Sequence, residues 1–242
     1  MTQETHQIVI LISADVEWQA VEQIVKPSKP LSSSPFGEWF LQDVPFRDRK
    51  LPVVFFQTGC GKIPSAAATQ FVLDKWNLQL IINLGTCGGF KGKVGRGDIL
   101  LVSKTVVYDI FERSGGHDEQ IAKYTTDLDF SWLEKPYPMN ALPATIATAD
   151  QDLDPERIAH LFEKYGAVAA DWESGAIAYV AHKNNKTRCL IVRGVSDVVD
   201  PSGGKPSSNK EITEGTRIVM GRLLESLPEW IEKVRRFGPT SR

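Results

Sequence analysis

Two acidic residues follow apolar runs of this chain, where a carboxyl group could exchange protons with a bound ligand. Asp197 comes after the Val-, Leu- and Ile-rich run 188–195, with only Ser196 between them, and Glu17 lies just beyond Ile8–Ile12. Short apolar runs predict buried strands, and open α/β sheets bind ligands at the carboxyl ends of their strands. Asp197 could instead cap a helix, because aspartate caps well and a polar segment follows it.

A third apolar run, Leu80–Leu84, leads into the glycine-rich segment Gly85–Gly89. Helix-like segments separate the three runs, and this alternation predicts parallel neighbouring strands in one sheet. The carboxyl ends of such strands meet at the same edge. We therefore expect Glu17, Gly85–Gly89 and Asp197 to surround one ligand-binding crevice.

The rest of the chain alternates between helical and extended patterns, which predicts a three-layer αβα sandwich with a central mixed sheet. Residues 111–140, dense in Gly, Asp, Lys, Pro and Tyr, form a long excursion of the kind that is functional or mobile. We expect strands over 38–41, 52–56, 99–108 and 143–149, and helices over 17–25, 65–76, 155–165, 173–184 and 211–234, the last interrupted at Pro228.

Composition indicates one globular domain spanning residues 1–242. With 42% hydrophobic and 24% charged residues the chain can bury a large core, and its net charge of -2 without a basic stripe argues against a nucleic acid polymer as partner. No apolar run approaches the roughly 18 residues of a membrane helix. The N-terminus lacks the basic segment of a signal peptide. We expect a cytoplasmic protein with no membrane partner.

The cysteines and histidines show no metal-ligand spacing. Cys60, Cys87 and Cys189 are odd in number and far apart, which indicates neither a disulfide framework nor a zinc site. We expect no metal and no cofactor, with Cys60 and Cys189 as small core residues. Neither Thr58–Lys62 nor Gly85–Gly89 matches a P-loop or a dinucleotide-binding motif.

Six segments together resemble the purine nucleoside phosphorylase and uridine phosphorylase superfamily. Their order and spacing are most similar to its hydrolytic branch, the methylthioadenosine/S-adenosylhomocysteine nucleosidases. The resemblance covers about Ile8 to Asp200 and implies a homodimer in which part of 111–140 completes the neighbour's pocket. The segments are Ser13–Glu17, Thr58–Lys62, Asn83–Gly89, Gly97–Leu100, Ala170–Ser174 and Arg193–Asp197.

The resemblance also implies a role for each acid on a purine nucleoside substrate. Cleavage of an N-glycosidic bond passes through an oxocarbenium-like state, which benefits from a proton donor to the base and a carboxylate that activates water. In the family pattern Asp197 protonates the base, Ser196 orients Asp197, and Glu17 activates the water. Glu173 accepts hydrogen bonds from the ribose hydroxyls. The residues that border base and sugar are Thr86, Cys87 and Gly88.

Each acid also has a purely structural interpretation. Glu17 could be a solvated first-turn acid that complements the helix dipole, and a one-residue shift of the alignment would put Trp18 in its position. Glu173 and Asp171 could be ordinary charges at a helix start. The three acids Glu17, Glu173 and Asp197 occur in the family's order, which favours an enzyme over a non-catalytic nucleoside-binding domain on the same fold.

Missing arginines favour water over phosphate as the acceptor. A phosphate dianion needs cationic or bidentate donors, usually arginine. The bacterial phosphorylases of this superfamily carry a segment similar to Arg-x-Gly-Ser at the positions where this chain has Asn83–Thr86. The segment Ser13–Gln19 contains no basic residue either. We therefore expect a nucleosidase, with a phosphate-dependent nucleoside phosphorylase as the alternative.

Departures from the family pattern leave the substrate open. Asp152, beside Leu153 in the expected site, stands where the nucleosidases carry an aromatic that stacks on the purine, and Trp172 replaces their usual methionine near the ribose. The tail Val198–Lys205 lacks an apolar lid for a thioalkyl group. Because a carboxylate only accepts hydrogen bonds, Asp152 should favour a base that presents N–H groups, such as a guanine-like ring. Plain adenine recognition should be weak unless Trp172 supplies another face.

Overall fold

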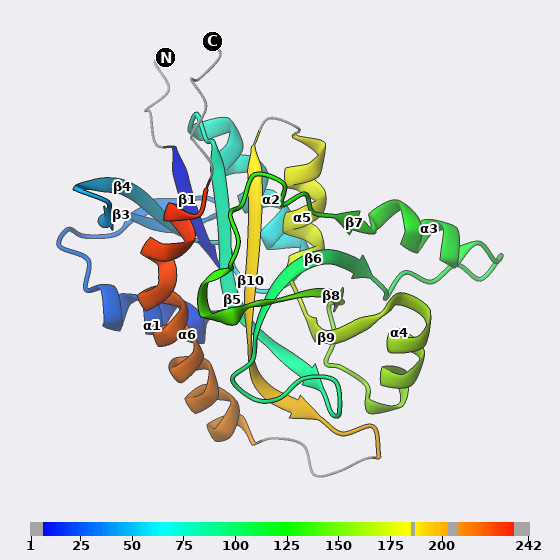
Figure 1. Cartoon of the computed structure of the whole chain (residues 1–242). Helices are drawn as coiled ribbons and strands as arrows, with labels where there is room; N and C mark the ends of the chain where they lie inside the picture. Colours follow the sequence, from blue (N-terminus) through cyan, green and yellow to red (C-terminus); the bar gives the residue numbers. More distant parts are fainter. Residues whose placement is uncertain (1–6, 185–186, 203–207, 235–242) are drawn as a thin grey trace.

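A ten-stranded mixed sheet organises the fold (Figure 1). The computed structural model describes residues 7–184, 187–202 and 208–234, so the expectations for residues 1–6 and for 203–205 of the tail lie outside the described residues. The strands follow the order β10-β6-β8-β9-β5-β1-β4-β3-β2, and β7 pairs with β6. Their bounds are β1 Ile8–Ile12, β2 Ser32–Ser34, β3 Gly37–Phe46, β4 Arg49–Gln57, β5 Leu80–Phe90, β6 Ile99–Val107, β7 Thr126–Asp127, β8 Leu142–Thr148, β9 Ala167–Asp171 and β10 Arg188–Val199.

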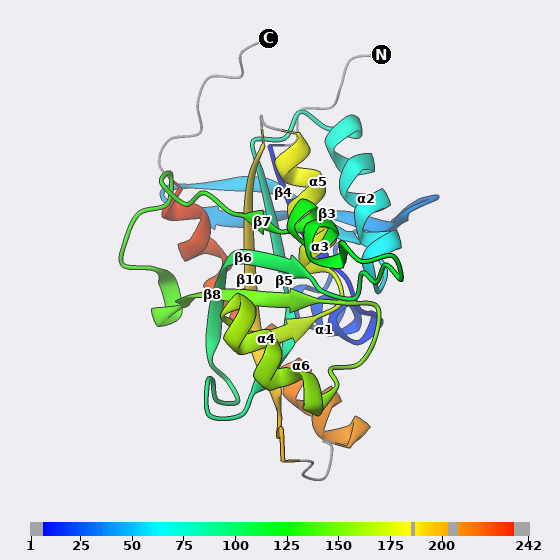
Figure 2. The same cartoon turned by 90° about the vertical axis from the view of Figure 1, so that its right-hand side faces the viewer.

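Helices cover both faces of this sheet (Figures 1 and 2). Trp18 of α1 and Leu223 of α6 belong to one buried core, whereas Val72 of α2 and Ile177 of α5 belong to a second. The predicted α/β fold with a central mixed sheet is thus confirmed. The helix bounds are α1 Asp15–Val25, α2 Lys62–Lys75, α3 His117–Tyr124, α4 Ile158–Tyr165, α5 Ser174–Lys183 and α6 Asn209–Glu232, with short 3-10 turns at Pro138–Asn140 and Pro155–Arg157.

The three strands that the sequence links to the site are parallel neighbours, as predicted: β5 pairs with β1 on one side and with β10 on the other. The sheet also curls back on itself. Strand β10 pairs antiparallel with β6, and β9 pairs antiparallel with β5. This curl brings the end of β9 beside Gly88 and Gly89 of β5.

The expected strand ends are wrong at both long central strands. Segment Gly85–Gly89 lies inside β5 because it pairs with Arg193–Val198 of β10. A Cβ atom at Gly85 would lie 2.9 Å from Nη1 of Arg193 and 3.0 Å from Oε1 of Glu17, so this close approach requires glycine. Asp197 lies within β10, after a register shift between Val195 and Asp197, so the helix-cap interpretation of Asp197 is wrong.

Strand β9 and helix α6 also differ from expectation. Strand β9, of sequence AVAAD, carries only short side chains before its aspartate and was not predicted. Helix α6 continues through Pro228. An internal proline costs about 3 kcal/mol, but burying a large apolar side chain contributes about 1.5–3 kcal/mol, and Leu227, Trp230 and Ile231 around Pro228 are all buried. None of the helices in the described part of the chain is long and apolar enough to cross a membrane.

Candidate active site

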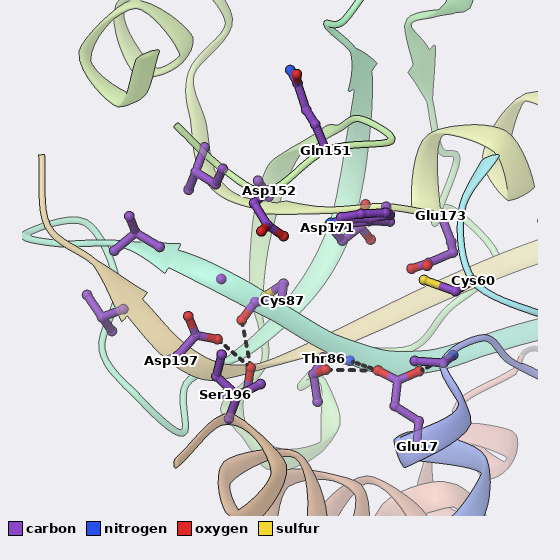
Figure 3. A pocket seen from close by; sticks show the side chains of 18 of the residues that line it. Glu17, Cys60, Thr86, Cys87, Gln151, Asp152, Asp171, Glu173, Ser196 and Asp197 are labelled. Atoms are coloured by element: carbon purple, nitrogen blue, oxygen red, sulfur yellow. Dashed lines mark hydrogen bonds between the residues drawn. The ribbon is translucent and has the colours of Figure 1, made fainter. Parts of the chain in front are cut away.

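A cavity of about 620 Å³ is lined by polar residues of α1, β5 and β10 (Figure 3). This volume suits a small-molecule ligand. The described residues contain no cluster of three or more His, Cys, Asp or Glu side chains that could hold a metal ion. All the predicted site residues line the cavity, namely Glu17, Thr86, Cys87, Gly88, Asp152, Leu153, Trp172, Glu173, Ser196 and Asp197.

Glu17 enters the cavity from the first turn of α1. Its side chain is buried, and Oε1 accepts hydrogen bonds from the backbone N–H of Thr86 at 2.6 Å and from the Thr86 hydroxyl at 2.9 Å. Oε2 accepts from the N–H of Ala14 at 3.2 Å. Glu17 is therefore a first-turn acid but not a solvated one. Trp18 packs against Phe40 in the core, so a one-residue shift of the alignment would exchange a cavity acid for a core residue.

Asp197 lines the cavity from β10. The hydroxyl of Ser196 donates to its Oδ1 at 2.8 Å and fixes the orientation of the carboxyl group. Burial raises the pKa of Asp197, although the Ser196 hydrogen bond and the charge of Arg96 oppose this. A carboxyl group with a raised pKa keeps more of its protonated form near neutral pH, as a proton donor requires.

Glu173 lies at the N-cap position of α5 and is buried. It accepts a hydrogen bond at 3.0 Å from the backbone N–H of Gly61, which precedes α2, so it joins two helix starts. Burial and the charges of Asp171 and Glu17 raise its pKa to about 7, against the opposing effect of Arg193. Glu173 is thus not an ordinary solvated helix-start charge.

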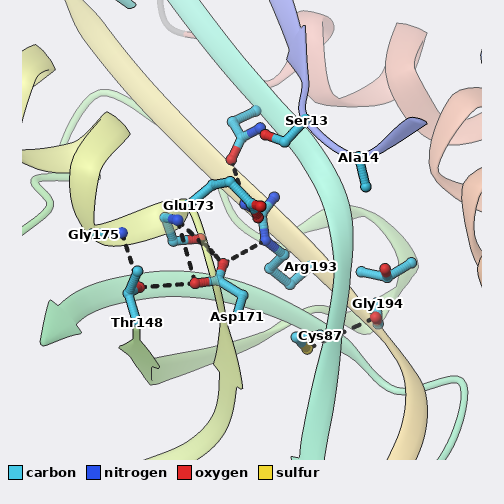
Figure 4. A network of polar contacts seen from close by, with 12 residues as sticks. Ser13, Ala14, Cys87, Thr148, Asp171, Glu173, Gly175, Arg193 and Gly194 are labelled. Atoms are coloured by element: carbon cyan, nitrogen blue, oxygen red, sulfur yellow. Dashed lines mark hydrogen bonds and ion pairs between the residues drawn. The ribbon is translucent and has the colours of Figure 1, made fainter. Parts of the chain in front are cut away.

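A buried ion pair, missed in the sequence, lies behind these acids (Figure 4). Nε of Arg193 donates to Asp171 at 2.8 Å, and Nη2 donates to Oδ1 of Asn83 at 2.6 Å. Asp171 also accepts from the hydroxyl of Thr148 at 2.8 Å and from Ser174. Asp171 therefore anchors a buried cation. The signal in the sequence was Arg193 itself, because a lone arginine inside an apolar strand has to be paired.

The third nitrogen of Arg193 lies near Glu17. Nη1 is buried and has no hydrogen-bond partner among the described residues, and a Cβ built on Gly85 would lie close both to Nη1 and to Oε1 of Glu17. Burial lowers the pKa of Arg193, but the carboxylates of Asp171, Glu17 and Glu173 raise it more, so the net shift is upward. The cation therefore offsets the negative charge of the surrounding acids.

Cys60 lines the cavity, and the prediction that it is a core residue is wrong. Its chain segment runs over the rim next to Glu173, where the side chain stays exposed (Figure 3). Burial of part of the thiol and the charge of Glu173 raise its pKa to about 12. Cys189 is buried as expected, and Cys87 is buried with its thiol directed at the carbonyl of Gly194.

We expect Glu173→Gln to alter how stability depends on pH. In the folded protein the Glu173 carboxyl group keeps its proton up to about pH 7, whereas its ordinary pKa is 4.5. The stability that this raised pKa contributes is therefore fully present below pH 4.5 and is lost as the pH rises through 7. Glutamine does not titrate. The unfolding free energy of the variant, relative to the wild type, should therefore rise by roughly 1–3 kcal/mol between these pH values.

Urea unfolding at several pH values from 4.5 to 7.5 measures this difference. The control is Glu163→Gln, at an exposed position on α4, whose difference from the wild type should stay flat. A flat difference for Glu173→Gln as well would contradict the prediction.

The fold and the cavity define an α/β chain with a site for a small molecule. A family model described as the phosphorylase superfamily matches residues 9–229, and the chain belongs to this superfamily. The 5'-methylthioadenosine/S-adenosylhomocysteine nucleosidase of Tolumonas auensis is 27% identical over 175 residues, which cover 67% of this chain and 74% of that protein. The enzyme of the same name from Bacillus pumilus is 30% identical over 162 residues, covering 60% and 68%.

Solved structures of other proteins share this fold. The apo structure of the Arabidopsis thaliana 5'-methylthioadenosine nucleosidase matches with a TM-score of 0.74 at 23% identity, covering 98% of this chain and 99% of that one. The likeness extends over almost the whole sheet and both helical layers. At this identity it supports the fold alone.

Proposed function

We propose that this protein is a nucleosidase that hydrolyses the N-glycosidic bond of a purine nucleoside, releasing the free base and the ribose moiety. The observation that carries the proposal is the presence of acids on two sides of one cavity. Asp197 and Ser196 lie on one side of it, and Glu17 and Glu173 lie on the other (Figure 3). The curated relatives reported above carry nucleosidase names, which supports the same reaction class.

In the proposed reaction the protonated Asp197 gives its proton to a ring nitrogen of the base. The C1'–N bond breaks, its electron pair leaves with the base, and positive charge develops on the ribose. Glu17 takes a proton from a water molecule, whose oxygen then bonds to C1'. One water is consumed, and the protons balance once Glu17 returns its proton to Asp197 through solvent.

Glu173 and Arg193 support this step in different ways. The Glu173 carboxyl group is the acceptor proposed for the ribose hydroxyls, and the N–H of Gly61 holds it in position. Arg193, through its pairing with Asp171, is a positioning residue that keeps a positive charge beside Glu17. A buried cation there lets several acids share the cavity without all of them being neutralised.

Water is a better acceptor than phosphate in this cavity. The charge of Arg193 acts on Glu17 and Glu173, but Asp171 and Asn83 already occupy two of its nitrogens. Glu17 and Glu173 are its other charged neighbours. A phosphate dianion would therefore face mainly carboxylates, which repel it.

We expect base release to be independent of added phosphate. The enzyme should release free base at the same rate with and without phosphate, and the sugar product should be the free ribose form. Chromatography of the base and mass spectrometry of the sugar, in water enriched in oxygen-18, test this. The label should appear at C1'. A pentose 1-phosphate would instead establish the phosphorylase alternative, and binding of nucleosides without any base release would establish a non-catalytic domain.

Three further expectations stay predictions: the homodimer, the cytoplasmic location and the assignment of residues 1–242 to one domain.

A further inference from the structure

Six carboxyl groups line the cavity, and five of them are held by protein donors. Asp152, on the loop after β8, is exposed, and the described residues offer it no hydrogen bond or ion pair. Its charge is therefore free to meet a ligand. The occupied pairs are Glu17 with Thr86, Asp171 with Arg193, Glu173 with the N–H of Gly61, Asp197 with Ser196, and Asp200 with Lys91.

The position of Asp152 relates it to the base. Figure 3 shows its carboxyl group on the same side of the cavity as Asp197, with Glu17, Glu173 and Cys60 grouped on the other side. Under the proposed function, on which this inference rests, the base lies next to Asp197 and the ribose next to Glu173. The free carboxylate of Asp152 is thus the unsatisfied acceptor of the base subsite.

A carboxylate has two acceptor oxygens and no donor. A 2-amino-6-oxopurine presents two adjacent donors on one edge, the ring N1–H and the 2-amino group, and both can bond to one carboxylate as a bidentate pair. Adenine presents its 6-amino donor beside the N1 acceptor, whose lone pair would face the second carboxylate oxygen. We propose that Asp152 is a specificity-determining residue that selects nucleosides of guanine-like bases over those of adenine.

The test compares guanosine with adenosine, which share the same ribose, so that the unknown preference at the 5' position cancels in the ratio of their kcat/KM values. The wild type should favour guanosine by about tenfold or more, the value of a hydrogen bond to a charged group. Asp152→Asn offers one donor and one acceptor, the pattern that matches adenine. This variant should lower the guanosine-to-adenosine ratio by about tenfold or more.

A matched control removes the same charge from the same loop. Asp154 is exposed, does not line the cavity, and accepts a hydrogen bond from the N–H of Glu156 at 2.9 Å. Asparagine can keep that cap, so Asp154→Asn should leave the ratio unchanged. Circular dichroism and melting temperatures of both variants verify that they fold.

The proposal and the hydrolase assignment fail in different ways. If no nucleoside releases a base, the hydrolase assignment fails, and the ratio is then read from the dissociation constants of guanine and adenine by titration calorimetry. A drop in the affinity for guanine relative to adenine in Asp152→Asn, measured as a rise in the ratio of the guanine Kd to the adenine Kd, supports the specificity role even then. A guanine-to-adenine ratio that is the same in the wild type and Asp152→Asn, in turnover or in binding, overturns it.

Discussion

Asp197→Asn is expected to lower kcat by at least about 100-fold, the lower range for the loss of a general acid. Asparagine has the same shape, so Ser196 can still donate to the side-chain oxygen and the strand pairing of β10 is untouched. What disappears is the transferable proton that the raised pKa of Asp197 retains. Steady-state release of the base from a purine nucleoside measures the loss.

The control for this variant is Asp200→Asn. Asp200 lines the same cavity, but a hydrogen bond from Lys91 and others from Ser202 lower its pKa to about 2, so it holds no proton to donate at neutral pH. Its variant should stay within a few-fold of the wild type. In the wild type kcat/KM should fall as pH rises through the raised pKa of Asp197, and this limb should be missing in Asp197→Asn. Activity within tenfold of the wild type in Asp197→Asn would remove Asp197 from the acid role.

Glu17→Gln is the second substitution with a large expected effect, about 10²–10⁴-fold in kcat, because glutamine cannot accept a proton from water. Thr86 can still donate to the side-chain oxygen of glutamine. The amide nitrogen would face the N–H of Ala14, so a small loss of stability should accompany the loss of turnover. KM should change less than kcat, because Glu173 is the proposed contact to the ribose.

Asp15→Asn separates this role from a helix-dipole effect. Asp15 is the other acid in the first turn of α1. It is exposed and accepts a hydrogen bond from the side-chain amide of Gln57. If Glu17 only complements the helix dipole, the two variants should lose similar amounts of stability and no activity. If Glu17 activates water, only its variant loses turnover.

The sequence predicts the three strands of the site well, because each is a mostly apolar run with an acid or glycines after it. It predicts their ends poorly. Gly85–Gly89 has no side-chain pattern that distinguishes a turn from a strand, and only its pairing with β10 decides between them. Pro228 is a helix breaker by local preference, and the burial of its neighbours, which is a tertiary property, overrides that preference.

The residues of the site also differ in how well the sequence predicts them. Glu17, Glu173 and Asp197 stand at recognisable positions, so they can be nominated from the sequence. The partner of Arg193 cannot, since Asp171 follows an unremarkable run of small residues and meets the arginine only through the curl of the sheet. Cys60 resembles a core residue by type, and only the course of the chain over the cavity rim shows otherwise.

The exposed thiol of Cys60 should react slowly with oxidants. Oxidants and alkylating agents attack the thiolate, and with a pKa of about 12 roughly one thiol in 10⁵ is ionised at pH 7. Partial burial contributes most to this, and the charge of Glu173 contributes next. Burial and the acid proposed to hold the sugar therefore together keep the neighbouring thiol protonated, so the pocket can leave a cysteine open to solvent while slowing its reaction with peroxide.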